Sequence, residues 1–149
     1  MQVSQKCQYA LRAVFELSRR YGQGPVKNAD IAEAQAIPPR FLEVILGQLR
    51  GTGVVDSRRG KAGGYFLARH PDQLTIGEII RLMGGAVGPV DCVAEPPEKS
   101  CPLHGQCVFL PIWEQARKAV VDVYDNVTFQ DLLEKDEKLK QRSAPSYVI

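Results

Sequence analysis

Residues 31–69, IAEAQAIPPRFLEVILGQLRGTGVVDSRRGKAGGYFLAR, carry two helix patterns followed by two short strand patterns. A short helix is expected over 29–34, with Asn28 as its N-cap, and a second is opened by Pro38 and Pro39 and runs to about Arg50. The expected buried stripe of this second helix is Phe41, Leu42, Ile45, Leu46 and Leu49. Two short helices joined by a tight turn, the second opening with basic and polar residues, are typical of a helix-turn-helix.

A β-hairpin is predicted directly after these helices. Val54 and Val55 begin one strand, and residues 65–67 form the other. The tip between the strands is basic and rich in glycine: Arg58, Arg59, Gly60, Lys61, Gly63 and Gly64. Glycines permit positive φ and close approach, while the cations suit phosphates or a DNA minor groove, so this hairpin is a candidate wing. A nucleotide-binding loop is the alternative, but the Lys-Ser/Thr ending of a Walker motif is missing.

Four further helices complete the pattern. An amphipathic helix over 4–21 carries Cys7 on its apolar stripe, where a cysteine acts as a small hydrophobe. A T-x-x-E capping box, Thr75 and Glu78, opens a helix that ends near residue 83. A long helix over 108–126 has one wide apolar stripe, which suggests a dimer contact, although packing within its own chain is the alternative. A short helix over 128–135 and a frayed tail follow.

The predicted fold class is therefore mainly α with a small β-hairpin wing. Its parts are a winged helix-turn-helix domain over 1–83, a cysteine-bearing loop over 84–107, a dimerisation helix with a short C-terminal helix over 108–135, and a tail over 136–149.

Charge is distributed unevenly along a chain of ordinary globular composition, 44% apolar and 24% charged. Residues 1–70 hold 11 Lys and Arg against 5 Asp and Glu, whereas the remainder holds 8 against 12. A basic N-terminal half suits a polyanion-binding surface. No apolar run approaches the roughly 18 residues of a membrane span, and the N-terminus lacks a signal-like core, so a cytoplasmic protein is expected.

Three of the four cysteines lie in one irregular segment, DCVAEPPEKSCPLHGQC, residues 91–107, with C-x8-C-x5-C spacing. Loops of this length are usually functional or disordered. Without a secretory signal, such thiols suggest metal ligands or redox groups. Thiolates suit iron–sulfur clusters. Zinc is a rival metal, although its usual C-x2–4-C pairs are missing, and a metal-free disulfide switch is a further alternative.

Taken together, SQKCQYALRAVFEL, the 31–69 stretch, LTIGEIIRLMGG and the three-cysteine loop resemble the IscR/NsrR-type (Rrf family) winged-helix transcription regulators over roughly residues 1–135. The resemblance implies a homodimer that binds double-stranded DNA at a roughly palindromic operator. It also implies an iron–sulfur cluster, commonly [2Fe-2S], held by three loop cysteines and a fourth residue.

Carried over by position, the resemblance places the cluster ligands at Cys92, Cys101 and Cys107. His104 is the local candidate for the fourth ligand. The alternatives are Asp91, or Gln8 or Cys7 contributed by the first helix of the other subunit. The DNA contacts fall at Pro39, Arg40, Glu43, Arg50, Arg58, Arg59, Lys61, Gly63 and Gly64.

This chain departs from the family pattern in two places. The gap between its first two cysteines is longer than is common, and the position where the best-known members carry a histidine, three residues after the third cysteine, is Leu110. Both differences leave the cluster type and the fourth ligand open.

The expected function is a DNA-binding regulator that senses redox, iron–sulfur or nitric oxide status through its cluster. The alternative is a cluster-free regulator that uses thiol switching or a complex with a partner metabolic enzyme. An enzyme is not expected, because no nucleophile–base pair, paired carboxylates or C-x-x-C motif occurs.

Overall fold

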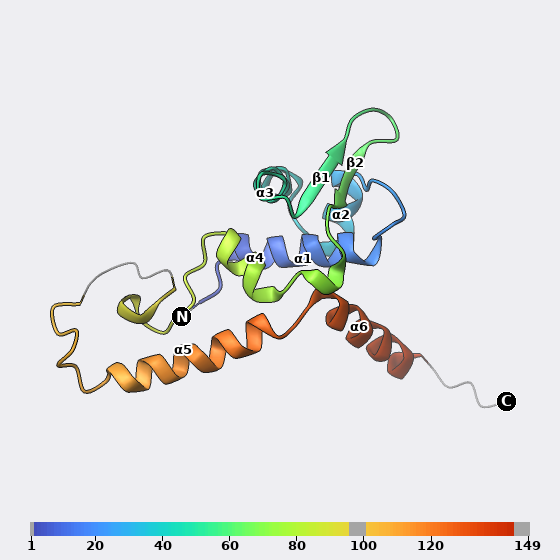
Figure 1. Cartoon of the computed structure of the whole chain (residues 1–149). Coiled ribbons are helices and arrows are strands. Elements are labelled where there is room, and N and C mark those ends of the chain that lie inside the picture. Colours follow the sequence, from blue (N-terminus) through green and yellow to red (C-terminus); the bar gives the residue numbers. More distant parts are fainter. Residues whose placement is uncertain (1, 96–100, 145–149) are drawn as a thin grey trace.

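The computed structural model describes residues 2–95 and 101–144. Its elements, in chain order, are α1 (Gln5–Arg19), α2 (Asn28–Gln35), α3 (Pro39–Gly51), β1 (Val55–Arg58), β2 (Gly64–Leu67), the 3-10 turn η1 (Pro71–Gln73), α4 (Ile76–Leu82), the 3-10 turn η2 (Asp91–Val93), α5 (Leu110–Asp125) and α6 (Phe129–Ser143). Figure 1 shows α1 through the middle, with α3 and the hairpin on one side and α4, α5 and α6 on the other.

Helix α1 is the centre of the core, as its apolar stripe predicts. The hydroxyl of Ser4 caps its first turn by accepting from the backbone N–H of Cys7 at 3.2 Å. The buried face includes Glu16, whose carboxylate accepts from Arg20 Nε at 2.8 Å and from Gln35 Nε2 at 2.9 Å. Because a buried carboxylate is costly unless it is paired, these bonds fix α2 against α1.

The two helices of the helix-turn-helix form where predicted, with two corrections. Asn28 is not an N-cap: it is the first helical residue, and Lys27 precedes it without a side-chain cap bond. The tight turn after α2 uses Ala36 in the left-handed region, with φ of 50°. Phe41 is not part of the buried stripe of α3, because its side chain is 60% exposed, while the other four predicted positions are buried.

The hairpin pairs in an antiparallel register that runs from Val55 opposite Leu67 to Arg58 opposite Gly64. Its base is attached to the segment before α2. Val26 and Tyr65 exchange two backbone N–H···O bonds, each of 2.8 Å. The predicted wing is therefore a two-stranded ribbon joined to the helix-turn-helix by a third short piece of extended chain.

The T-x-x-E capping box of α4 is only half formed. Thr75 Oγ1 accepts from the backbone N–H of Glu78 at 3.2 Å, as predicted. The Glu78 carboxylate does not return a bond to the cap, because it pairs instead with the guanidinium of Arg69 from the stretch after the hairpin.

The C-terminal helices differ from expectation in length. The capping box of Thr128 and Asp131 is complete, but α6 continues to Ser143, so the prediction of a fraying tail from residue 136 was wrong for 136–143. A pair between Lys140 and Asp136 at 2.7 Å, four residues apart, supports this extra length. Phe129 is fully buried in the core around α1, and its N–H donates to Leu74 O at 3.0 Å.

Within the described residues, no helix is both long and apolar enough to cross a membrane.

Candidate nucleic-acid interface and cysteine segment

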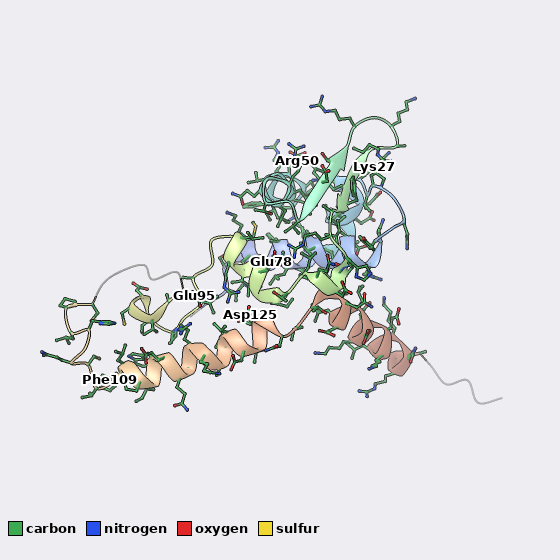
Figure 2. The ribbon with its side chains drawn as sticks, viewed as in Figure 1. Lys27, Arg50, Glu78, Glu95, Phe109 and Asp125 are labelled. Carbon is green, nitrogen blue, oxygen red and sulfur yellow. The ribbon has the colours of Figure 1, made fainter. Side chains whose placement is uncertain are left out.

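The outward face of α3 is polar and open at the predicted positions. Pro39 opens the helix, where its missing N–H costs nothing, and Arg40 and Glu43 lie exposed on the next turn. Arg50, near the end of α3, donates from Nη1 to Ser57 Oγ at 3.0 Å and so connects the helix to β1. Figure 2 shows Arg50 on the α3 side, far from Phe109 at the start of α5.

The hairpin tip carries its cations into solvent. Arg59 and Lys61 are exposed at the tip, and the guanidinium of Arg58 lies 6.0 Å from the Phe66 ring centroid. Within the part of the chain that the structure describes, five cations of α3 and the hairpin make no ion pair: Arg40, Arg50, Arg58, Arg59 and Lys61. Cations without a carboxylate partner remain available to an external polyanion.

Gly63 and Gly64 shape the wing. A Cβ on Gly63 would lie 2.8 Å from the carbonyl carbon of Arg59 and closer still to Arg58 O. A Cβ on Gly64, whose φ is +153°, would lie 2.5 Å from the carbonyl carbon of Val26. Both distances are far below a van der Waals contact, so any side chain here would push the backbone apart. These two glycines let the hairpin close on itself and on residue 26.

The cysteine segment is an irregular path between α4 and α5 (Figure 1). Its described part contains η2 and an antiparallel bridge between Val87 and Glu95. Residues 96–100, where the extra spacing between the first two cysteines falls, lie outside the described residues. Glu95 accepts from Arg117 Nη1 of α5 at 3.1 Å, and η2 packs against α5. The described part of the segment is therefore attached to the N-terminal half of α5.

The four predicted cluster positions are only partly brought together. Cys92, Cys101 and Cys107 are free thiols of intermediate exposure, and His104 is exposed. Cys92 and His104 line one open hollow, together with Glu114 and Arg117. The donor types suit an iron–sulfur cluster. Among residues 2–95 and 101–144, no three His, Cys, Asp or Glu side chains are gathered closely enough to hold a single metal ion.

The alternative fourth ligands differ in accessibility. Cys7 is 1% exposed, and burial raises the pKa of its thiol, so it is the core hydrophobe that its place on the stripe predicts. Gln8 and Asp91 are exposed, and Gln8 Nε2 donates to Val3 O at 3.0 Å.

Helix α5 has no buried residue within the described chain, although its apolar stripe is continuous. Phe109, Ile112 and Val123 are each more than half exposed, and Phe109 stacks on Trp113 at 6.3 Å between centroids. The other end of α5 is attached to the winged domain: Arg81 of α4 donates to both carboxylate oxygens of Asp125, at 2.7 and 3.0 Å. This hydrogen bonding lowers the pKa of Asp125.

The predicted sites omitted an apolar hollow beside the outward face of α3. It is lined by Lys6, Arg40, Phe41, Val44 and Ile45 and has a volume of about 350 Å³. The signal was present in the sequence, because Val44 lies two residues from Leu42 and two from Leu46. At 3.6 residues per turn, that places it opposite the buried stripe.

Comparisons with known proteins identify the family of the chain. The sequence model of the Rrf2 family, described as an iron-dependent transcriptional regulator, matches residues 3–135. The HTH-type transcriptional regulator CymR of Bacillus subtilis is 35% identical over 133 residues, 89% of each chain. The HTH-type transcriptional regulator IscR of Pectobacterium atrosepticum is 30% identical over 139 residues, 93% of this chain and 83% of that protein.

Two solved structures share the fold along nearly the whole chain. The structure of B. subtilis CymR, described as the global cysteine regulator, superposes with a TM-score of 0.74 at 33% identity, covering 91% of this chain and 98% of CymR. IscR of T. potens superposes with a TM-score of 0.77 at 33% identity, covering 99% and 95%. The resemblance drawn from the sequence is confirmed, and the chain belongs to the Rrf2 family of DNA-binding transcriptional regulators.

Proposed function

We propose that the protein acts as a homodimer in which each subunit applies α3 and the hairpin to one half-site of a DNA operator, while the cysteine segment adjusts the affinity. The observation that carries this proposal is the placement of cations, free of ion pairs with any described residue, on the α3 face and the hairpin tip, both on one side of α1 (Figure 1). An operator for such a dimer has two half-sites about one helical turn, ~34 Å, apart or a multiple of it.

The residues divide into two kinds of DNA contact. Arg40 and Glu43 face the position of base edges in the major groove, where arginine suits guanine and a carboxylate suits cytosine. Arg58, Arg59 and Lys61 suit phosphates or the minor groove. Gly63 and Gly64 act indirectly by shaping the wing.

Selection of bound sequences from a random DNA pool tests this division. The Arg40→Ala protein should enrich a different base at one position of each half-site. An unchanged preference would reject base contact by Arg40.

The dimer contact assigned to α5 rests on its exposed apolar face. Val120, Val121 and Tyr124 pack partly against the core, but Phe109, Ile112 and Val123 are each more than half exposed. Exposed apolar groups along one helix are typical of a surface that another molecule covers. A second copy supplies an identical stripe, and a two-fold axis lets the same residues meet on both sides.

For the sensing chemistry, the first candidate is an iron–sulfur cluster on Cys92, Cys101 and Cys107. It is supported by the donor set and by the family's description as iron-dependent. Absorption spectra with iron and sulfide assays, on protein purified without oxygen, test it. A brown protein whose visible bands disappear in Cys92→Ala, Cys101→Ala and Cys107→Ala would support the cluster. A colourless protein without iron or sulfide would exclude it.

The second candidate is direct thiol sensing. It is supported by the three loop thiols, which are free and partly exposed, and by one relative. A Staphylococcus aureus CymR, 31% identical over 89% of this chain, has been solved in an oxidized form. Here two thiols would lose two electrons and two protons to an oxidant such as a peroxide and form a disulfide. Peptide mass mapping after oxidation, combined with DNA-binding titrations, tests it, since a disulfide without an effect on affinity would reject the role.

A further inference from the structure

The apolar hollow beside α3 has a feature that the contacts proposed above do not use. Phe41 and Val44 are 60% and 61% exposed. This is unusual for large apolar side chains, because their neighbours on the exposed face of α3 are charged or polar. The Phe41 ring leans toward α1 and lies 6.3 Å from the Tyr9 ring. Val44 stands beside it, next to Arg40 on the outward face.

Positive charge surrounds this hollow. Lys6 from α1 and Arg40 from α3 both line it, and neither makes an ion pair within the described residues. The wing cations lie beyond α3 on the same side of α1 (Figure 1). An occupant should therefore be apolar where it meets Phe41 and Val44 and anionic around that contact.

Size distinguishes between possible occupants. A stable protein interface needs about 800 Å² from each partner, whereas only five residues line this hollow. The DNA major groove offers an apolar group with these anionic surroundings: the 5-methyl of thymine projects from a base pair that phosphates flank on both sides.

We propose that Val44 and Phe41 contact the 5-methyl group of one thymine in each half-site, with Lys6 and Arg40 facing the adjacent phosphate or base edge. This contact selects thymine over cytosine at that position, because only thymine carries the methyl group. The inference rests on the proposed insertion of α3 into the major groove.

The test removes the methyl group from the DNA and leaves the protein intact. After selection of an operator, each thymine is replaced in turn by deoxyuridine, which keeps every hydrogen-bonding group of thymine. At one position per half-site, the wild-type protein should bind about fourfold more weakly, the effect of uncovering one methyl-sized group. Substitution in both half-sites should weaken binding about 16-fold.

The protein variants complete a double-mutant cycle. Val44→Ala and Phe41→Ala should lower affinity for the thymine operator and respond less than twofold to deoxyuridine. Both side chains are mostly exposed, so the fold should persist, and circular dichroism checks this. Leu139→Ala, which truncates an equally exposed leucine on α6, is the matched control and should respond to deoxyuridine like the wild type.

The possible outcomes distinguish a failure of the methyl contact from a failure of the proposed DNA-binding function. Tight operator binding, with no thymine at which the wild type and Val44→Ala differ, would overturn the methyl contact alone. Loss of the dimer in Val44→Ala, measured by sedimentation, would assign the hollow to a second copy and also overturn it. If selection from a random DNA pool enriches no sequence, both the proposed function and the methyl contact are rejected.

Discussion

Gly64→Ala should detach the base of the wing. The added Cβ would lie 2.5 Å from the carbonyl carbon of Val26 and closer still to its oxygen, and both are backbone atoms that no rotamer change can move. The backbone of residues 26 and 64 must separate. The two 2.8 Å bonds that Val26 and Tyr65 exchange are then lost.

The magnitude follows from these contacts. Two backbone hydrogen bonds contribute about 2 kcal/mol, at roughly 1 kcal/mol each. Strain in the φ of residue 64 adds about 1 kcal/mol. A loss of about 3 kcal/mol lowers the Tm of a chain of this size by roughly 9 °C. The log–log slope of DNA affinity against salt should flatten by about 0.9 for each phosphate contact that the displaced wing loses.

Thermal unfolding at one protein concentration, with amide hydrogen exchange at Tyr65, provides the measurement. Gly47→Ala is the matched control: Gly47 lies inside α3, has no positive φ, and a Cβ there meets nothing within 4 Å. It should raise stability by about 1 kcal/mol, since alanine favours helix over glycine. A Gly64→Ala protein with wild-type Tm and a protected Tyr65 amide would refute the reasoning.

Three further changes test other parts of the molecule. Arg59→Ala should weaken binding to every DNA sequence and flatten the salt slope by about 0.9 per lost phosphate contact; an unaltered slope in titrations over a range of KCl would contradict its role in the wing. Val123→Glu should produce monomers in sedimentation while the control Leu139→Glu stays dimeric; a dimeric Val123→Glu would reject α5 as the interface. Because the hydrogen bonds from Arg81 lower the pKa of Asp125, its contribution is complete above about pH 4, the ordinary carboxyl pKa, and is lost as pH falls through the folded-state value. Asp125→Asn should remove this part of the acid dependence, about 1 kcal/mol or less for a pair this exposed, in urea unfolding from about pH 2 to pH 6, and an unchanged dependence would contradict the pairing.

The positions of the helices were predictable wherever an apolar stripe packs against the core of the same chain. Cys7, Val14 and Leu17 in α1 are spaced three, four or seven residues apart from other apolar residues, so they all lie on one face of the helix, and that face is buried. Phe41 was misplaced because residue type was counted ahead of angular position. It lies at the edge of the stripe of α3, about 100° around the helix from the fully buried Leu42.

Competition among side chains decided the features that local patterns missed. Glu78 fits the sequence pattern of a capping box, yet its carboxylate bonds to Arg69, nine residues earlier. A hydrogen bond to a charged guanidinium is stronger than one to the neutral backbone N–H. Helix α6 extends past residue 135 because the following residues, DEKLKQR, are mostly good helix formers and include the Asp136–Lys140 pair.

The cysteine spacing predicted a set of ligands but not their arrangement, for a physical reason. In the described part of the segment, backbone pairing is local: the Val87–Glu95 bridge, η2, and turn bonds from the N–H of His104 to Cys101 O and from the N–H of Gln106 to Leu103 O. The relative positions of Cys92, Cys101 and Cys107 therefore depend on what binds them or bonds them together. The recognition face is different, because α3 is rigidly packed and the positions of Arg40 and Glu43 follow from the helix itself.

The attachments of α5 indicate how the two regions communicate. Its C-terminal end is held to the winged domain by the bidentate Arg81–Asp125 pair, and Gly77 leaves room for that carboxylate, which a Cβ there would contact directly. Its N-terminal half is held to the cysteine segment by Arg117 and Glu95. Between these points α5 has no fully buried residue, and Val120, Val121 and Tyr124 pack only partly against the core. In the proposed mechanism, a change in the cysteine segment therefore reaches the winged domain as a tilt of α5 about Asp125. In a dimer joined through α5, that tilt changes the distance between the two α3 helices, which is the quantity an operator with fixed half-site spacing discriminates.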